Sequence, residues 1–435
     1  MAVETPLISA FMARLAHPEI NLAAYGGVVM PLALIVESPI IMLLAASTTL
    51  SKDWASYKQI RRYMLGAGAA LTTFHVLVAF TPLYDAVVRG VIGVPAEVVA
   101  PARLGLMIML PWSWSIAYRR FNQGVLIRFG HSHVVGLGTG VRLSAEIVVL
   151  IAGYFIHTLP GIAVGVGAIA VGVTSEAAYI GLHVQPVLRL QLKAAPPVQP
   201  PLTLRGFVAF YVPLMMTSLL SLLIEPTGSA ALSRMPRPLE SLAVWPVVHG
   251  LIFMLQSMGI ALNEVVVTYM EQPGAAATLR RFTMTLVLLT TGGLLVLVAT
   301  PLADLWFRQV AALPPELVEL AHAALWLALP LPAMSALQSY FQGAILHSRR
   351  TRGITESVIA YMVTVGMLLA SGVVWGRMMG LYVGMVAFAL GISLQTGWLF
   401  VRSRAAMHSI HARDAALASQ APTVYKALGS LPPSW

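Results

Sequence analysis

Acidic side chains inside long apolar stretches are the residues of this chain most able to do chemistry. Glu37 lies near the middle of the apolar run 21–48, between Pro31 and Pro39. A helix of roughly 20 apolar residues crosses a bilayer, and a charge at its centre costs at least ~2.5–3.5 kcal/mol on insertion scales. The two prolines loosen the helix around the carboxylate. We expect Glu37 either to exchange a proton or cation or to be a structural acid capped by Ser38 and neighbouring helices.

Other carboxylates occupy comparable positions in apolar stretches. Glu225 stands before Pro226, at a helix end where it can face water. Glu146 follows Arg142 by four residues, the spacing of an ordinary helical ion pair. Glu264 follows Asn263 and is a candidate for lining a polar path. The full candidate set for ion coupling is Glu37, Glu225, Glu4, Glu264, Gln256, Glu146 and Glu176.

Other catalytic chemistry is not indicated. His75 and His249 could relay protons, but a lone histidine on an apolar helix is more commonly a hydrogen-bonded structural residue. No spacing matches a zinc or calcium site, and the chain has no cysteine. We expect neither an enzyme nor a bound metal or cofactor, only H⁺ or Na⁺ as a coupling ion.

The composition predicts an all-α polytopic membrane protein. Of the 435 residues, 58% are hydrophobic and only 10% are charged, whereas soluble domains carry about 25% charged residues. The formal charge of +10 is attributed to loops beside the membrane and not to nucleic-acid binding.

Eleven apolar stretches are long enough to span. A proline-rich segment divides them, which predicts a lobe over 1–185, a linker over 186–205, a second lobe over 206–401 and a tail over 402–435. The first lobe contains 21–48, 63–88, 98–118, 135–157 and 160–183, and the second contains 206–224, 242–268, 282–307, 317–340, 354–375 and 379–401. The apolar stub 1–15 is too short to cross alone.

An internal repeat pairs the two lobes at an offset of 219 positions. Arg61-Arg62 then falls on Arg280-Arg281, and Pro82-Leu83 falls on Pro301-Leu302; further pairs are Asp85/Asp304, Arg89/Arg308, Gln123/Gln342 and Gly172/Gly391. Two parallel six-helix repeats are therefore expected, twelve helices in all. The repeat also predicts that the first helix is incomplete, either because the true start lies upstream, which we favour, or because the chain is truncated.

Charge distribution predicts the orientation. Of the 27 Lys and Arg residues, 20 fall between spans or near span ends on one side of the membrane, including the linker and the tail. This side is expected to be cytoplasmic. The arginine doublets are expected to be topology anchors that can touch anionic lipid head groups. Asp85/Arg89 and Asp304/Arg308 are each predicted to form a structural ion pair at the outer end.

The repeat resembles the multidrug and toxic compound extrusion (MATE) family of the flippase superfamily. Each half has a Gln-Gly after its fourth helix, in FNQGVLIRFGHSH and YFQGAILHSRRTR, and starts its final helix with GIAVG or GLYVG. A divergent ankylosis-like branch is similar in the same features. The glycine- and arginine-rich signature of the major facilitator superfamily is not seen in 51–62.

The resemblance implies a secondary transporter in a bacterial-type inner (plasma) membrane, with linker and C-terminus cytoplasmic. It would export a small organic solute by H⁺- or Na⁺-coupled alternating access, and an amphipathic cation is the favoured substrate class. Expected partners are the lipid bilayer and a small-molecule substrate, with the chain working as a monomer. Alternatives are a small-organic-anion transporter, a flippase for a lipid-linked precursor, and a non-transporting scaffold.

Overall fold

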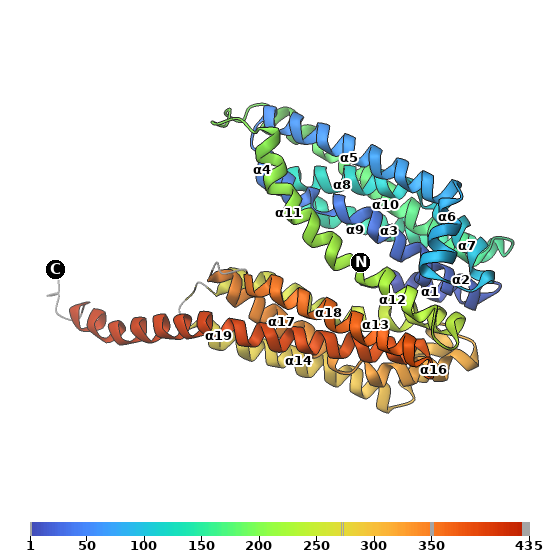
Figure 1. Ribbon diagram of the computed structural model, residues 1–435. Coiled ribbons are helices and arrows are strands. Elements are labelled where there is room, and N and C mark those ends of the chain that lie inside the picture. Colours follow the sequence, from blue (N-terminus) through green and yellow to red (C-terminus); the bar gives the residue numbers. More distant parts are fainter. Residues whose placement is uncertain (1, 271, 273, 349–351, 429–435) are drawn as a thin grey trace.

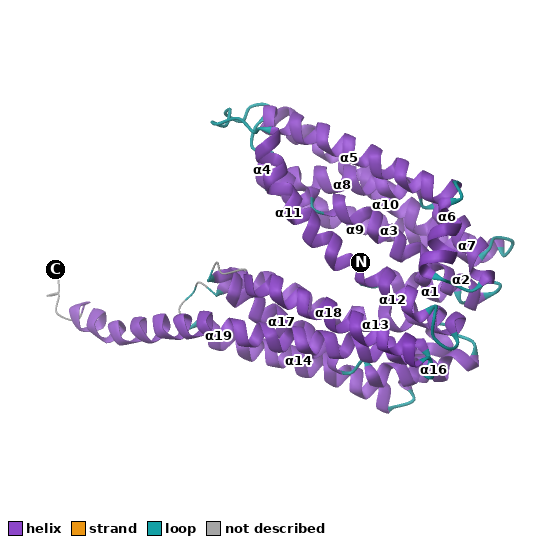
Figure 2. Cartoon of the chain, viewed as in Figure 1, coloured by secondary structure: helices purple, strands orange, loops and turns teal. Residues whose placement is uncertain are grey.

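The protein is built of helices. The computed structural model describes residues 2–270, 272, 274–348 and 352–428, and no strand occurs in these ranges (Figure 2). Ten of its helical segments are long and apolar enough to cross a bilayer: Pro18–Leu50, Trp54–Phe80, Ser132–Ile156, Gly161–Leu192, Leu204–Leu232, Pro238–Tyr269, Ala275–Ala299, Pro315–His347, Arg352–Trp375 and Gly380–Ala416. The expected all-α membrane fold is confirmed.

The first half of the chain forms one bundle. Its helices, in order, are α1 (Glu4–Met12), α2 (Pro18–Ala24), η1 (Tyr25–Val29), α3 (Met30–Ile41), α4 (Leu43–Leu50), α5 (Trp54–Phe80), α6 (Leu83–Asp85), η2 (Ala86–Ile92), α7 (Ala96–Ile108), α8 (Leu110–Arg128), α9 (Ser132–Ile156), α10 (Gly161–Val187) and η3 (Leu188–Leu192). The pair α7–α8 takes the place that the repeat gives to the fourth span.

The second half forms the other bundle. Its helices are α11 (Leu204–Leu222), α12 (Ile224–Leu232), α13 (Pro238–Tyr269), α14 (Ala275–Ala299), α15 (Leu302–Leu305), η4 (Trp306–Val310), α16 (Pro315–Leu327), α17 (Pro330–His347), α18 (Arg352–Trp375) and α19 (Gly380–Leu428). Most of these helices pack together below the first bundle in Figure 1.

One helix of the second half lies on the first lobe. The Tyr211 hydroxyl of α11 donates to the Pro39 carbonyl of α3, and the rings of Phe207 and Tyr63 stack with centroids 4.3 Å apart. The helix is interrupted after α11 because Pro226 has no N–H to donate to the carbonyl four residues earlier. The seventh span therefore runs from one lobe to the other (Figure 1).

The repeat is visible in equivalent contacts. Arg103 Nε donates to the Ala79 carbonyl at 3.0 Å, and His322 Nε2 lies 2.9 Å from the Val298 carbonyl, each residue shifted by 219. A Cβ on Gly153 would stand 2.4 Å from Val164, and the matching Cβ on Gly372 would stand 2.4 Å from Val383. Such a distance is below van der Waals contact, so both halves depend on glycine for the same close helix approach.

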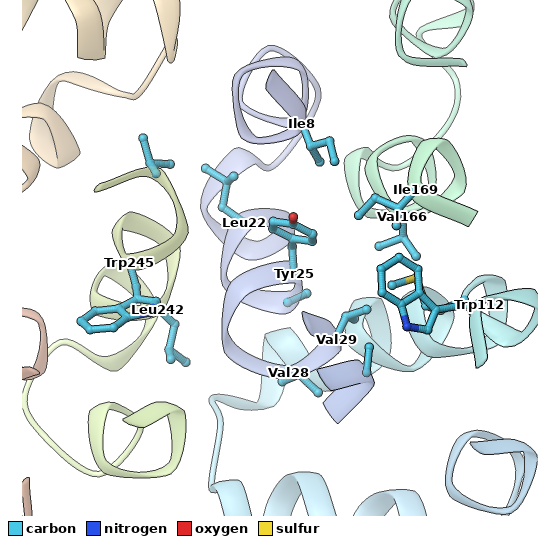
Figure 3. Close-up of a cluster of buried hydrophobic side chains, with 14 of the residues drawn as sticks. Ile8, Leu22, Tyr25, Val28, Val29, Trp112, Val166, Ile169, Leu242 and Trp245 are labelled. Carbon is cyan, nitrogen blue, oxygen red and sulfur yellow. The ribbon is translucent and has the colours of Figure 1, made fainter. Parts of the chain in front are cut away.

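The lobes meet at the end that carries the turns 13–17 and 233–237, here called the outer end. Figure 3 shows Leu242 of the second lobe on the side towards the cluster of Leu22, Tyr25 and Val28 in the first, while the Trp245 ring points back into its own lobe, where it packs against Phe388. Pro246 lies directly over Gly26, where a Cβ would meet it at 2.5 Å. Close backbone packing of α13 on α2 and η1 therefore joins the lobes.

Two arginines fasten this outer end. Arg14 donates from Nη1 to the Val310 carbonyl at 2.8 Å and from Nη2 to Gln309. Arg234 stands two residues after the end of α12, as Arg14 does after α1 (an offset of 220 in this turn), and donates to the carbonyls of Ile92 and Val91 at 2.8 and 2.6 Å. Each arginine thus binds the C-terminal carbonyls of a π-helix in the opposite lobe, where partial negative charge gathers. We call these contacts the two outer latches.

The other end, called the basic end, carries the α4–α5 turn, the linker and the tail, and there the lobes diverge (Figure 1). Asp53 caps α5 by accepting from Ser56 N at 2.9 Å and ties down the linker by accepting from Val198 N at 3.1 Å. Burial raises the pKa of Asp53, but these hydrogen bonds outweigh it and hold the pKa below its usual range.

Only one of the two predicted acid–base pairs forms as expected. Arg89 Nε donates to Asp85 at 2.9 Å, which confirms the first. Asp304 instead pairs with Nδ1 of His322 at 2.9 Å, so the prediction for Arg308 is wrong. The two halves differ in the residue that stands near the aspartate. In the second half this residue is His322, whereas in the first half it is Arg103, whose guanidinium lies 5.2 Å from the centre of the Tyr84 ring.

Candidate functional site

A cluster of buried charges occupies the interior of the first lobe. Its centre is Arg142 on α9, which is 3% exposed. Arg142 donates from Nη2 to Glu4 of α1 and from Nε to Glu146 at 2.8 Å. One arginine thus binds two carboxylates from two helices, and its guanidinium also lies 5.7 Å from the centre of the Trp112 ring. The predicted ion pair of Arg142 and Glu146 is confirmed.

A second ion pair lies deeper, between α8 and α10. Arg119 Nη1 donates to Glu176 Oε2 at 2.6 Å, and both side chains are almost fully buried. Gln123 Nε2 donates to the other oxygen of Glu176 at 2.9 Å. Both carboxylate oxygens are therefore bound, as the large cost of an unpaired buried charge requires.

Glu37 differs from these acids. It is 4% exposed on α3, yet no hydrogen bond or ion pair reaches its carboxylate from the residues that the structure describes. The expected cap from Ser38 is wrong, because the Ser38 hydroxyl donates to the Ile35 carbonyl at 2.8 Å. The charges that act on Glu37 are those of Arg120, Arg119, Arg142 and Glu4.

This arrangement can hold a small cation or a proton. With all groups ionised, the cluster contains four carboxylates (Glu4, Glu37, Glu146 and Glu176) against three guanidinium groups (Arg119, Arg120 and Arg142). The formal charge of these side chains is −1: Arg142 is shared by two carboxylates, while Glu37 has only the charge of Arg120, which makes no described ion pair, as its largest opposite charge. A proton or a monovalent cation at Glu37 would neutralise the site, which a buried position strongly favours.

The second lobe repeats this geometry without the charge. Gln338 and Gln395 occupy the positions of Arg119 and Glu176, and Gln338 Nε2 still donates to Gln395 Oε1 at 3.3 Å. Tyr361 stands in place of Arg142 and Val365 in place of Glu146. The charged centre therefore belongs to the first lobe alone.

The remaining candidates lie apart from the charge cluster. Glu225 on α12 is half-buried, and its charge acts on Tyr361. Gln256 Nε2 is 3.5 Å from the Leu331 carbonyl, at the limit of a hydrogen bond. Glu264 is exposed and lines a pocket of about 480 Å³ between α13, α17 and α18, together with Asn263, Ser335, Gln338, Ser339 and Gln342. The second lobe thus offers a polar pocket with one acid.

The histidines have structural surroundings. His75 is buried, with Nε2 3.0 Å from the Leu106 carbonyl and Nδ1 3.2 Å from the Ser113 hydroxyl. His249 lies between the rings of Trp245 and Phe253. Within the described ranges, no group of three or more potential metal ligands comes together.

The most important residue that the sequence analysis missed is Arg119. The fourth span was expected to end at residue 118, which placed Arg119 in a loop, but α8 continues to Arg128. The repeat contained the correcting signal: the equivalent span was expected to reach residue 340, which corresponds to 121. Applying the offset to the helix ends would have placed Arg119 inside the lobe.

Comparisons with known proteins now define the fold. No family model and no curated protein matches the chain, but solved structures do. An inward-facing multidrug resistance MATE family transporter of the MOP superfamily has a TM-score of 0.74 at 13% identity, covering 94% of this chain and 96% of the other. The lipid II flippase MurJ, inward closed, has a TM-score of 0.66 at 12% identity, covering 99% and 92%.

An outward-facing MATE structure gives a lower TM-score of 0.55 at 14% identity, with 94% and 96% covered. The chain therefore has the fold of MOP-superfamily transporters, and the resemblance to the MATE family is confirmed at the level of fold. Identities of 12–14% leave the function to be inferred from the side chains of the site.

Proposed function

We propose that this protein is a secondary active transporter in which loading of Glu37 with a proton or Na⁺ biases the positions of the two lobes. The observation that carries the proposal is the contrast inside one lobe: Glu4, Glu146 and Glu176 are bound by arginines, while Glu37 is equally buried without a partner. An unpaired ionised carboxylate is costly in this position. The described arrangement therefore suits a loaded, neutral Glu37.

The state of the lobes fits this role. They are closed at the outer end by the two latches and diverge at the basic end (Figure 1). If the basic end is cytoplasmic, as its excess of Lys and Arg indicates, this is an inward-facing state. The linker and tail then lie in the cytoplasm of a cell whose plasma membrane holds the protein.

An amphipathic organic cation is the substrate class that the charges favour. The first-lobe cluster carries a formal −1, and the pocket of the second lobe contains Glu264 with no described arginine or lysine on its wall. A pyrophosphate-bearing lipid precursor or a small organic anion would need a surplus of cationic donors. A flippase or an anion transporter is therefore a lesser alternative.

The test is dye-cation efflux from proteoliposomes under an imposed proton or sodium gradient. Wild-type protein is expected to respond to one gradient, and Glu37→Gln is expected to lower driven efflux at least tenfold while folding normally. Glu240→Gln is the matched control, because Glu240 pairs with Arg237 within its own lobe. Driven efflux that persists in Glu37→Gln, alone and combined with Glu225→Gln, would refute the coupling role.

A further inference from the structure

An amphipathic groove opens on the surface of the second lobe, away from the charge cluster. It lies between α14, α17 and α19 and encloses about 940 Å³. Three arginines line it, Arg280 and Arg281 from α14 and Arg404 from α19, with Tyr340, Phe341, Phe400, Met284 and Leu288 among the other lining residues. Among the residues that the structure describes, no acidic side chain lines the groove.

The three arginines are exposed. Within the described part of the chain, no carboxylate pairs with any of them. Arg404 instead lies 4.7 Å from the centre of the Phe400 ring, a cation–π contact. Three cations at one groove without an acid repel one another, and an anion placed between them would remove that repulsion.

The groove changes character along its length. The arginines lie towards the basic end of α14, whereas Leu288 is eight residues further into the span, roughly 12 Å at the rise of an α-helix. The rings of Phe341 and Phe400 pack with centroids 5.4 Å apart at its side. A ligand that fits has an anionic head at the membrane surface and an apolar tail that descends beside the protein.

We propose that this groove binds one anionic phospholipid from the leaflet at the basic end. The phosphate would lie among Arg280, Arg281 and Arg404, and an acyl chain would lie along Met284, Leu288 and Phe400. Arginines hold phosphate oxygens by paired hydrogen bonds, and anionic head groups attract basic side chains at this depth. This site is independent of the proposed coupling at Glu37.

The internal repeat supplies a matched comparison inside the same chain. Arg61 and Arg62 occupy the positions of Arg280 and Arg281 and are also exposed. Three other groove residues are not repeated there, since Gln185 stands in place of Arg404, Gly181 in place of Phe400 and Asn122 in place of Phe341, although Phe121 stands in place of Tyr340 and Leu65 in place of Met284. The first lobe thus has the arginine doublet without the third arginine and without two of the aromatic rings.

The experiment is a lipid titration of the purified full chain in detergent, read by native mass spectrometry. Wild-type protein is expected to retain one phosphatidylglycerol and to bind phosphatidylcholine at least tenfold more weakly. R280Q/R281Q should weaken phosphatidylglycerol binding at least tenfold, because each basic residue near the membrane surface contributes roughly fivefold to the affinity. The control R61Q/R62Q should bind within twofold of wild type. Equal losses in the two doublets would mean diffuse surface attraction and would overturn the proposal.

A second variant separates a lipid from a soluble anion and does not depend on removing charge. M284W fills the apolar part with all three arginines intact and is expected to reduce phosphatidylglycerol retention. Glycerol 3-phosphate, which has the head group without the tail, is expected not to displace the lipid at equal concentration. Displacement by glycerol 3-phosphate, or unchanged retention in M284W, would contradict a lipid site.

Discussion

At the scale of single residues, ion pairing distinguishes the charged residues that stabilise the lobe from Glu37, which is proposed to bind the coupling ion. Arg119 and Glu176 lock α8 to α10, and Arg142 joins α1 to α9. Glu37 has the same burial and lacks such a partner. The spacing of Arg142 and Glu146 was enough to predict their ion pair. The bond from Arg142 to Glu4, across 138 positions, could not be predicted because it depends on tertiary packing.

The pair of Arg119 and Glu176 provides a prediction on stability. Arg119→Gln leaves Glu176 as an uncompensated buried charge and is expected to destabilise the protein by about 3–5 kcal/mol. The double variant R119Q/E176Q recreates the Gln–Gln pair that the second lobe uses at these positions. The double variant should recover most of the stability that Arg119→Gln loses.

Thermal unfolding in detergent measures this effect for Arg119→Gln and for the double variant. A matched control is Gln338→Ala, which removes only a neutral hydrogen bond and should cost about 1 kcal/mol. A double variant as unstable as Arg119→Gln would show that the charges themselves, and not their pairing, support the lobe.

At the scale of elements, the outer latches are the most specific contacts between the lobes. Their two arginines occupy equivalent places in the repeat, and each reaches the end of a π-helix in the other half. The repeat offset predicted which elements correspond. The latch could not be predicted, since neither arginine has an acidic partner in the sequence and both bind backbone carbonyls.

The variant R14Q/R234Q is expected to favour opening of the outer end. Each latch is worth about 1 kcal/mol at such an exposed position, so the pair should change the ratio of closed to open protein roughly 30-fold. Spin labels at L83C and L302C, equivalent sites near the outer end, report the separation of the lobes. The chain has no cysteine of its own, so only these sites are labelled.

Arg237→Gln is the control for the latches, because Arg237 lies on the same rim and pairs with Glu240 of its own lobe at 3.0 Å. Its distance distribution should match that of the labelled parent. An unchanged distribution in R14Q/R234Q would show that α13 packing on α2 closes the outer end without the latches.

At the scale of the whole molecule, the two repeats share a framework and differ in charge. Composition and the offset of 219 predicted the helical membrane fold and its twofold organisation, because both depend on patterns that persist over hundreds of residues. The crossing of α11 onto the first lobe was not predicted. It depends on contacts of Tyr211 and Phe207 with partners far away in sequence.

The asymmetry suggests a division of labour between the lobes. The first contains the charged cluster, and the second contains neutral glutamines and a polar pocket beside Glu264. In the account proposed here, ion loading occurs in the first lobe and its effect is transmitted through the contacts of α1, α2 and η1 with α13 at the outer end.

The most direct test is the pH dependence of the distance between labels at L83C and L302C, with and without Glu37→Gln. A neutral Glu37 suits the described arrangement, so low pH should favour the short outer distance and high pH should populate a longer one. If Na⁺ is the coupling ion, it should restore the short distance at high pH. Glu37→Gln, which is permanently neutral, should keep the short distance throughout. A pH response that persists unchanged in Glu37→Gln would contradict the central claim.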